Sequence, residues 1–79
     1  MPIDYYAETT RIIDALASEG LSAEGRPLRD VMRDGSTATE ILMGVRWHLQ
    51  EIARANTIIS LNTMRAVREL IAELDKVLS

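Results

Sequence analysis

Cysteine is absent from this sequence of 79 residues, and His48 is its single histidine. Without cysteine there are no disulfide bonds, no thiolate zinc sites and no cysteine nucleophile. Glu51 follows His48 by three residues, but two ligands do not complete a metal site, and no second cluster is present. Carboxylate pairs are compatible with the spacing, but helical chains this short rarely form the deep pocket that shifts a carboxyl pKa. We therefore expect no metal, no cofactor and no enzymatic activity.

Long apolar runs are also missing. The longest, Ile41–Val45, is far shorter than the roughly 20 residues that a membrane-spanning helix needs. The first residues, MPIDYYAE, carry acids where a secretory signal carries lysine or arginine. Together with the absence of cysteine, these features predict a cytoplasmic protein that does not associate with a membrane.

Glycine and proline are scarce, with four and two copies, and helical signals fill the stretches between them. Asp4 is a candidate N-cap, Pro27 suits a first helical position, and Thr37 with Glu40 forms a capping-box pattern. We predict an all-α fold in one domain, residues 1–79, as a small three- or four-helix bundle with a short second helix and two long C-terminal helices. The predicted helices span about 5–17, 27–34, 37–55 and 57–78.

Apolar residues recur at three- and four-residue spacing in both long helices, so each has one face that requires a partner. Leu49 and Leu74 lie on these faces and are predicted core residues. The two helices either break near Asn56 and Thr57 and fold back on each other, which we favour, or continue as one helix of about 40 residues. The continuous helix would need a second chain over its apolar face and would make the protein a homodimer.

Met43 and Trp47 lie one turn apart on the third predicted helix, rotated away from the apolar face of Val45 and Leu49. Either another helix of the same fold covers them, or a partner protein does. We predict burial within the fold. Partner contact is the alternative, because tryptophan is enriched at binding hot spots.

Negative charge is concentrated in the first third of the chain. Residues 1–25 contain five acids and one base, whereas the remainder is close to neutral and the whole chain carries −3. Such a surface attracts basic proteins and repels nucleic acid. We therefore expect acids of this region and of the following short helix to contact a basic partner: Asp14, Glu19, Glu24, Asp30 and Asp34.

The second and third predicted helices have the order of a DNA-binding helix-turn-helix. The match fails because Asp30 and Asp34 fall where this motif buries apolar groups. The arginines on the short helix do not make a basic footprint either, since acids close in sequence can pair with them: Arg26 with Asp30, and Arg33 with Asp34. No nucleic-acid partner is expected.

The segment LRDVMRDGSTATEILMGVRWHLQEI resembles the middle of small helical immunity proteins, which are encoded beside the toxic C-terminal domains of bacterial contact-dependent inhibition and related polymorphic toxins. The resemblance covers about a third of the chain and follows the pattern GST-x-TEILM-x-x-R-x-H-L. It implies a helical inhibitor that occludes the active site of a cognate toxin. It transfers no binding residue to this chain.

The predicted function is that of a protein-binding module, an immunity protein or antitoxin that neutralises a basic, nuclease-type toxin domain in the bacterial cytoplasm. The absence of a catalytic set and the acidic first third of the chain agree with this function. The alternative is a self-associating helical structural or adaptor protein, such as a phage or regulatory component.

Overall fold

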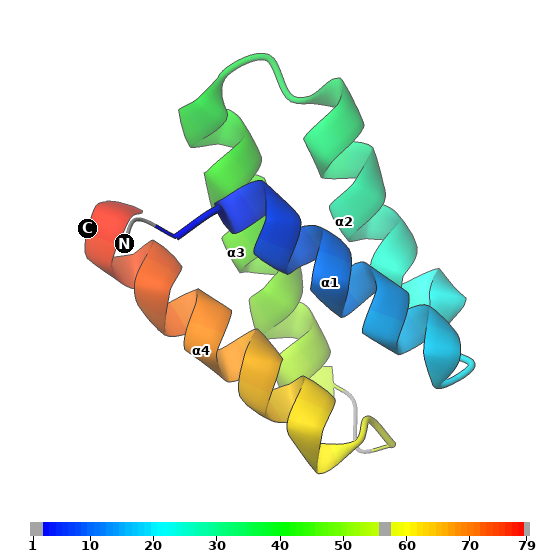
Figure 1. Ribbon diagram of the computed structural model, residues 1–79. Helices are drawn as coiled ribbons and strands as arrows, with labels where there is room; N and C mark the ends of the chain where they lie inside the picture. The colour runs from blue at the N-terminus through cyan, green and yellow to red at the C-terminus, as the bar shows by residue number, and fades with distance from the viewer. Residues whose placement is uncertain (1–2, 56–57, 79) are drawn as a thin grey trace.

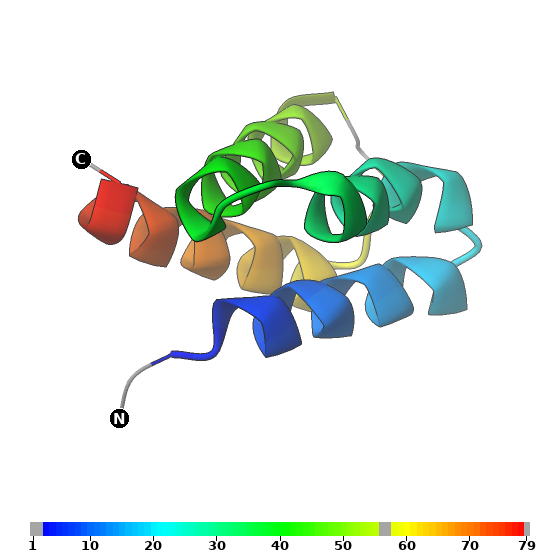
Figure 2. The same ribbon diagram turned by 90° about the horizontal axis from the view of Figure 1, so that it is seen from above.

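The computed structural model describes residues 3–55 and 58–78, and these form four α-helices and no strand. In chain order the helices are α1 Tyr5–Ser18, α2 Ser22–Asp34, α3 Ala38–Ala55 and α4 Leu61–Leu78. Each helix packs against the next, and α4 closes the ring by packing against α1 (Figure 1). Seen from above, α1 and α4 form one layer and α2 and α3 the other (Figure 2). The predicted all-α fold is confirmed.

One fully buried leucine from each helix fills the centre of the ring. These residues are Leu16, Leu28, Leu49 and Leu74. Their burial confirms the two core positions predicted for α3 and α4. The apolar face of each amphipathic helix is therefore turned toward the centre of the bundle, and its polar face is turned toward solvent.

The helix starts follow the capping residues in the sequence. Asp4 Oδ1 accepts the N–H of Ala7 at 3.0 Å. Thr37 Oγ1 accepts the N–H of Glu40 at 3.1 Å, while the Glu40 carboxylate accepts the N–H of Ser36 at 3.3 Å. The caps predicted at Asp4 and Thr37 are thus present, each satisfying one N–H group of its helix, except that Glu40 reaches the residue before the cap.

The end of α1 turns directly into α2. Gly20 has a φ of +77°, in the left-handed region that glycine adopts without strain. The N–H groups of Gly20 and Leu21 donate to the carbonyls of Ala17 and Leu16, at 3.1 and 2.8 Å. This arrangement is a Schellman motif, and it buries Leu21 at the start of the next helix.

The prediction that α2 begins at Pro27 is wrong. The helix begins at Ser22, so residues predicted as a loop form its first turns and Pro27 lies inside it. Local propensity disfavours this start, because the segment contains Gly25 and a proline without an N–H group. Tertiary packing decides instead: Gly25 is buried against Ile13 of α1.

The chain folds back between α3 and α4. Ala55 ends α3, residues 58–60 are not helical, and α4 begins at Leu61 rather than at the predicted residue 57. Asn56 and Thr57, where the break was predicted, lie outside the described residues. The alternative of one continuous helix is wrong, because α3 and α4 pack against each other within one chain.

Candidate protein-binding groove

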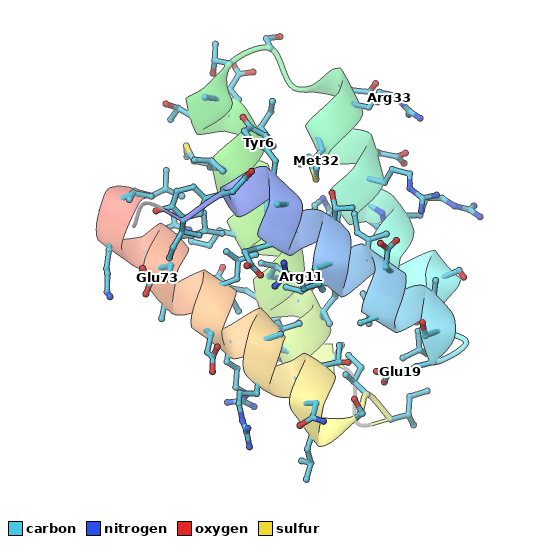
Figure 3. All side chains as sticks on the ribbon, viewed as in Figure 1. Tyr6, Arg11, Glu19, Met32, Arg33 and Glu73 are labelled. Carbon is cyan, nitrogen blue, oxygen red and sulfur yellow. The ribbon has the colours of Figure 1, made fainter. Side chains whose placement is uncertain are left out.

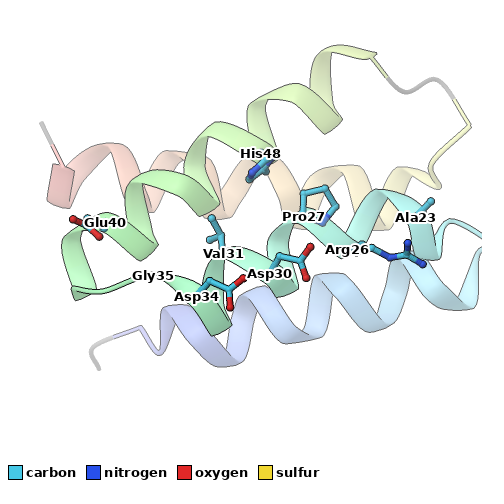
Figure 4. Close-up of a pocket in the computed structure, with 9 residues that line it drawn as sticks. All are labelled: Ala23, Arg26, Pro27, Asp30, Val31, Asp34, Gly35, Glu40 and His48. Carbon is cyan, nitrogen blue, oxygen red and sulfur yellow. The ribbon is translucent and has the colours of Figure 1, made fainter.

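A groove runs along the outer side of α2 and α3. Gly44 allows the two helices to approach closely, since a Cβ atom there would lie 2.7 Å from Val31 Cγ2. Two adjoining hollows of about 600 and 370 Å³ make up the groove. Both are lined by Ala23, Pro27 and His48, so they adjoin. Figure 4 shows the residues that line the larger hollow.

Carboxylates occupy both ends of this groove. Asp34 and Glu40 lie where α2 ends and α3 begins, and Glu24 and Glu51 lie where α2 begins and α3 ends. Asp30 lies between them. The apolar part of the lining is contributed by Ala23, Pro27, Val31 and Ile52.

Two arginines pair with some of these carboxylates from outside the groove. Arg33 Nε donates to Asp34 at 2.9 Å and Arg33 Nη2 to Asp30 at 3.2 Å. The hydrogen bond from Arg33 lowers the pKa of Asp34. Arg54 pairs with Glu51. The predicted pair of Arg26 with Asp30 is not present, and Asp30 pairs with Arg33 instead.

The carboxylates of Glu24 and Glu40 can still accept most of the hydrogen bonds and ion pairs that a carboxylate can form. Within residues 3–55 and 58–78, the Glu24 side chain makes no hydrogen bond and no ion pair, and Glu40 accepts a single backbone N–H. Counting five lining carboxylates against Arg26, Arg33 and Arg54 leaves the groove with a charge of −2. The groove is therefore electrostatically suited to a cationic partner.

The prediction that Met43 and Trp47 are buried within the fold is wrong. Their exposed fractions are 51% and 57%, because they lie on the side of α3 opposite Leu49 and no described helix covers that side. The Trp47 ring meets the His48 ring edge-on, with centroids 5.0 Å apart and planes at 88°. His48 lines the groove, so Trp47 contacts one of the lining residues while lining neither hollow itself.

Glu19 belongs to the fold instead of the groove. Its carboxylate accepts the Ser60 N–H at 2.8 Å, the Ser60 hydroxyl at 2.9 Å and the Thr63 hydroxyl. Ser60 Oγ in turn accepts the N–H of Thr63 and caps α4. Figure 3 shows Glu19 at the end of α1, near the start of α4. The hydrogen bonds from Thr63 and Ser60 lower the pKa of Glu19.

The structure thus brings together three of the five acids predicted to bind a partner: Glu24, Asp30 and Asp34. Asp14 is exposed on α1 and lines neither hollow of the groove. The sequence reasoning missed Glu40 and Glu51 as members of the same surface. Their spacing along α3 with His48 in between places all three on the side facing α2, which was the available signal.

Another hollow, of about 560 Å³, lies between α1 and α4. Two of its carboxylates are already paired, Glu8 with Arg11 and Glu73 with Lys76. Glu69 has no ion pair among the described residues. This hollow therefore has one described carboxylate without an ion pair, where the α2–α3 groove has two, Glu24 and Glu40.

Within the described part of the chain there is no group of three side chains placed to hold a metal ion. None of the four helices combines the length and the apolar character needed to cross a bilayer. In comparisons with protein families, curated proteins and solved structures, the chain matches no family model, no curated protein and no solved structure.

Proposed function

We propose that this protein is a protein-binding inhibitor, an immunity protein or antitoxin, that covers the basic cleft of a nuclease-type toxin domain with its α2–α3 groove. A nuclease cleft carries cationic groups for phosphate, and a groove with net negative charge complements it. In this proposal the protein acts in the bacterial cytoplasm, performs no reaction and needs no cofactor.

The observation that carries the proposal is a pair of carboxylates at opposite ends of the groove that no arginine engages: Glu24, which makes no side-chain bond among the described residues, and Glu40, which accepts one backbone N–H. Exposed Trp47, whose ring contacts that of His48, adds a large apolar surface of the kind that dominates binding energy. The same groove disfavours a nucleic-acid partner, because phosphates would be repelled by five carboxylates.

The alternative is an adaptor that dimerises through one long helix, and it requires α3 and α4 to be continuous. They are separate helices instead. The apolar faces of α3 and α4 are covered within a single chain, with Leu49 and Leu74 fully buried. A second copy is therefore not required to bury them.

Coexpression tests the proposal. The chain is expressed together with the C-terminal domain encoded by the reading frame directly upstream of its gene, and growth is compared with expression of that domain alone. We expect rescue of growth, and we expect the purified proteins to form a one-to-one complex without nuclease activity. An upstream domain that arrests growth regardless of this chain, or an upstream frame that encodes no toxin, would contradict the proposal.

A further inference from the structure

The outer face of α3 carries a stripe of side chains at three- and four-residue spacing. Its two large apolar members, Met43 and Trp47, are 51% and 57% exposed. No described helix packs on this side of α3 (Figure 2). In chain order the stripe consists of Glu40, Met43, Trp47, Gln50 and Arg54. Such spacing places all of them on one face, in the pattern along which two helices pair side by side.

Opposite charges flank Trp47 at equal distances. Glu40 precedes Trp47 by seven residues, and Arg54 follows it by seven. Seven residues are almost two helical turns, so both charges share the face of Trp47 and each lies about 10 Å from it along the helix. The stripe is therefore complementary to itself. When it is turned end for end, it presents a base opposite each acid and tryptophan opposite tryptophan.

We propose that this face binds a second copy of the same chain, with the two α3 helices antiparallel about a two-fold axis at Trp47. The two Trp47 rings then cover each other at the axis, and Glu40 of each copy faces Arg54 of the other. Met43 lies between these two contacts. A parallel pair would place Glu40 against Glu40 and Arg54 against Arg54, so the charges select the antiparallel arrangement.

Both charged residues are available for this pairing. The Arg54 side chain is 74% exposed in its ion pair with Glu51, and exposed pairs of this kind contribute little to stability. The Glu40 carboxylate accepts one backbone N–H, that of Ser36, which leaves room for a guanidinium. A partner surface of one charge sign would be attracted by one end of the stripe and repelled by the other. A second copy matches the charges at both ends.

A contact through one helix face is small, so the dimer should be weak and should depend on concentration. In sedimentation equilibrium we expect a monomer at about 1 μM and a dimer at several hundred micromolar. Trp47 reports the contact directly, because it is the single tryptophan. Its fluorescence emission should shift to shorter wavelength as the concentration rises, since its exposed ring leaves water in the dimer.

Charge-swap variants test the antiparallel register. Glu40→Arg and Arg54→Glu each place like charges opposite each other twice, so each should weaken the dimer about tenfold. The double variant restores opposite charges and the net charge of the wild type, so it should recover the wild-type affinity. Overall charge alone predicts a different result: Glu40→Arg would strengthen the dimer, because it makes the chain less negative, and Arg54→Glu would weaken it.

Trp47→Ser removes the centre of the proposed contact and should leave a monomer at several hundred micromolar. Val77→Ser is the matched control, because Val77 is 52% exposed on α4 and lies outside the stripe. Circular dichroism checks that each variant is folded. A wild-type chain that stays monomeric, a dimer that survives Trp47→Ser, or a double charge swap that binds no better than the single variants would overturn the inference.

The homodimer needs only this chain, so it is independent of the proposed function. Glu40 also lines the α2–α3 groove, so a toxin domain bound there would displace the second copy, which fits the expected one-to-one complex. A chain that dimerises through Trp47 but inhibits no toxin domain would support the inference and overturn the proposed function. An inhibitory chain that stays monomeric at several hundred micromolar would do the opposite.

Discussion

Glu19 and Glu24 are only five residues apart, yet the fold uses them in opposite ways. Glu19 accepts three hydrogen bonds from the start of α4, across 41 to 44 residues of sequence. Glu24 lines the groove and makes no side-chain bond within the described residues. The same residue type in the same acidic stretch therefore holds two helices together in one place and remains available to a partner in the other.

The difference shows that a count of acids overstates the binding surface. Carboxylates that bond to the protein's own N–H and O–H groups contribute to folding, and their oxygens are already occupied by those donors. The α1–α4 junction, formed by Glu19, Ser60 and Thr63, should govern stability. The α2–α3 groove should govern association. The predictions below run from the largest expected effect to the smallest.

The largest effect should come from the core that lies beneath both regions. Leu49→Ala and Leu74→Ala each leave a cavity at a fully buried position and should cost about 2 to 5 kcal/mol. Urea unfolding monitored by circular dichroism measures the loss. Leu61→Ala is the control, because Leu61 is 84% exposed and should change little. A loss below about half a kcal/mol at both core positions would contradict the fold.

A smaller loss should follow when the cap of α4 is removed. Ser60→Ala takes away the oxygen that accepts the Thr63 N–H and a hydroxyl that donates to Glu19, so it should cost roughly 0.5 to 2 kcal/mol. Ser36→Ala is the matched control, since no described hydrogen bond uses the Ser36 hydroxyl. Equal unfolding free energies for the two variants would remove Ser60 from the junction.

The third prediction concerns the pH dependence of the junction. Hydrogen bonds from Thr63 and Ser60 lower the pKa of Glu19 in the folded state, so folding favours its ionised form. The resulting stabilisation is fully present above the ordinary glutamate pKa and is lost as the pH falls through the lower folded value. Glu19→Gln should therefore lose less stability than the wild type as the pH falls from neutral to about 3.

Thermal unfolding across this pH range measures the slope, and Glu24→Gln is the control that should keep the wild-type slope. If the stability of Glu19→Gln falls with pH as steeply as that of the wild type, the carboxylate does not stabilise the junction through its charge.

The smallest effect on stability is expected in the groove. Glu24→Gln should change the unfolding free energy by less than about 0.5 kcal/mol, because it removes no described hydrogen bond or ion pair. Calorimetry at neutral pH compares the unfolding free energy of Glu24→Gln with that of Glu19→Gln. A larger loss from Glu24→Gln than from Glu19→Gln would reverse the assignment of the two residues.

Periodicity and caps were sufficient to predict the helical fold. The apolar faces that contain Leu49 and Leu74, and the caps at Asp4 and Thr37, depend on residues within one or two turns of each other. The start of α2 depends on contact between Gly25 and Ile13 of another helix, and local propensity gives the opposite answer. Packing overrode propensity there, as it commonly does.

The site was less predictable because exposure and bonding are tertiary properties. The helical spacing of Met43 and Trp47 placed them away from the core face, but it could not tell whether another helix covers them. Glu19 looked like any acid near a helix end. The start of α4 offered one hint, since Ser60 and Thr63 form a cap without the glutamate that usually completes it. Glu19 supplies that carboxylate from α1.

The most direct test of the division between fold and groove is the rate at which the proposed toxin partner associates with each of two charge-reversal variants. Glu24→Lys and Asp14→Lys change the net charge equally, but only Glu24 lines the groove. Stopped-flow measurements at several salt concentrations give each rate constant and its salt slope. We predict that Glu24→Lys slows association several-fold more than Asp14→Lys and has the shallower salt slope. Equal slowing by the two variants would contradict the account, since overall charge alone would then explain the attraction.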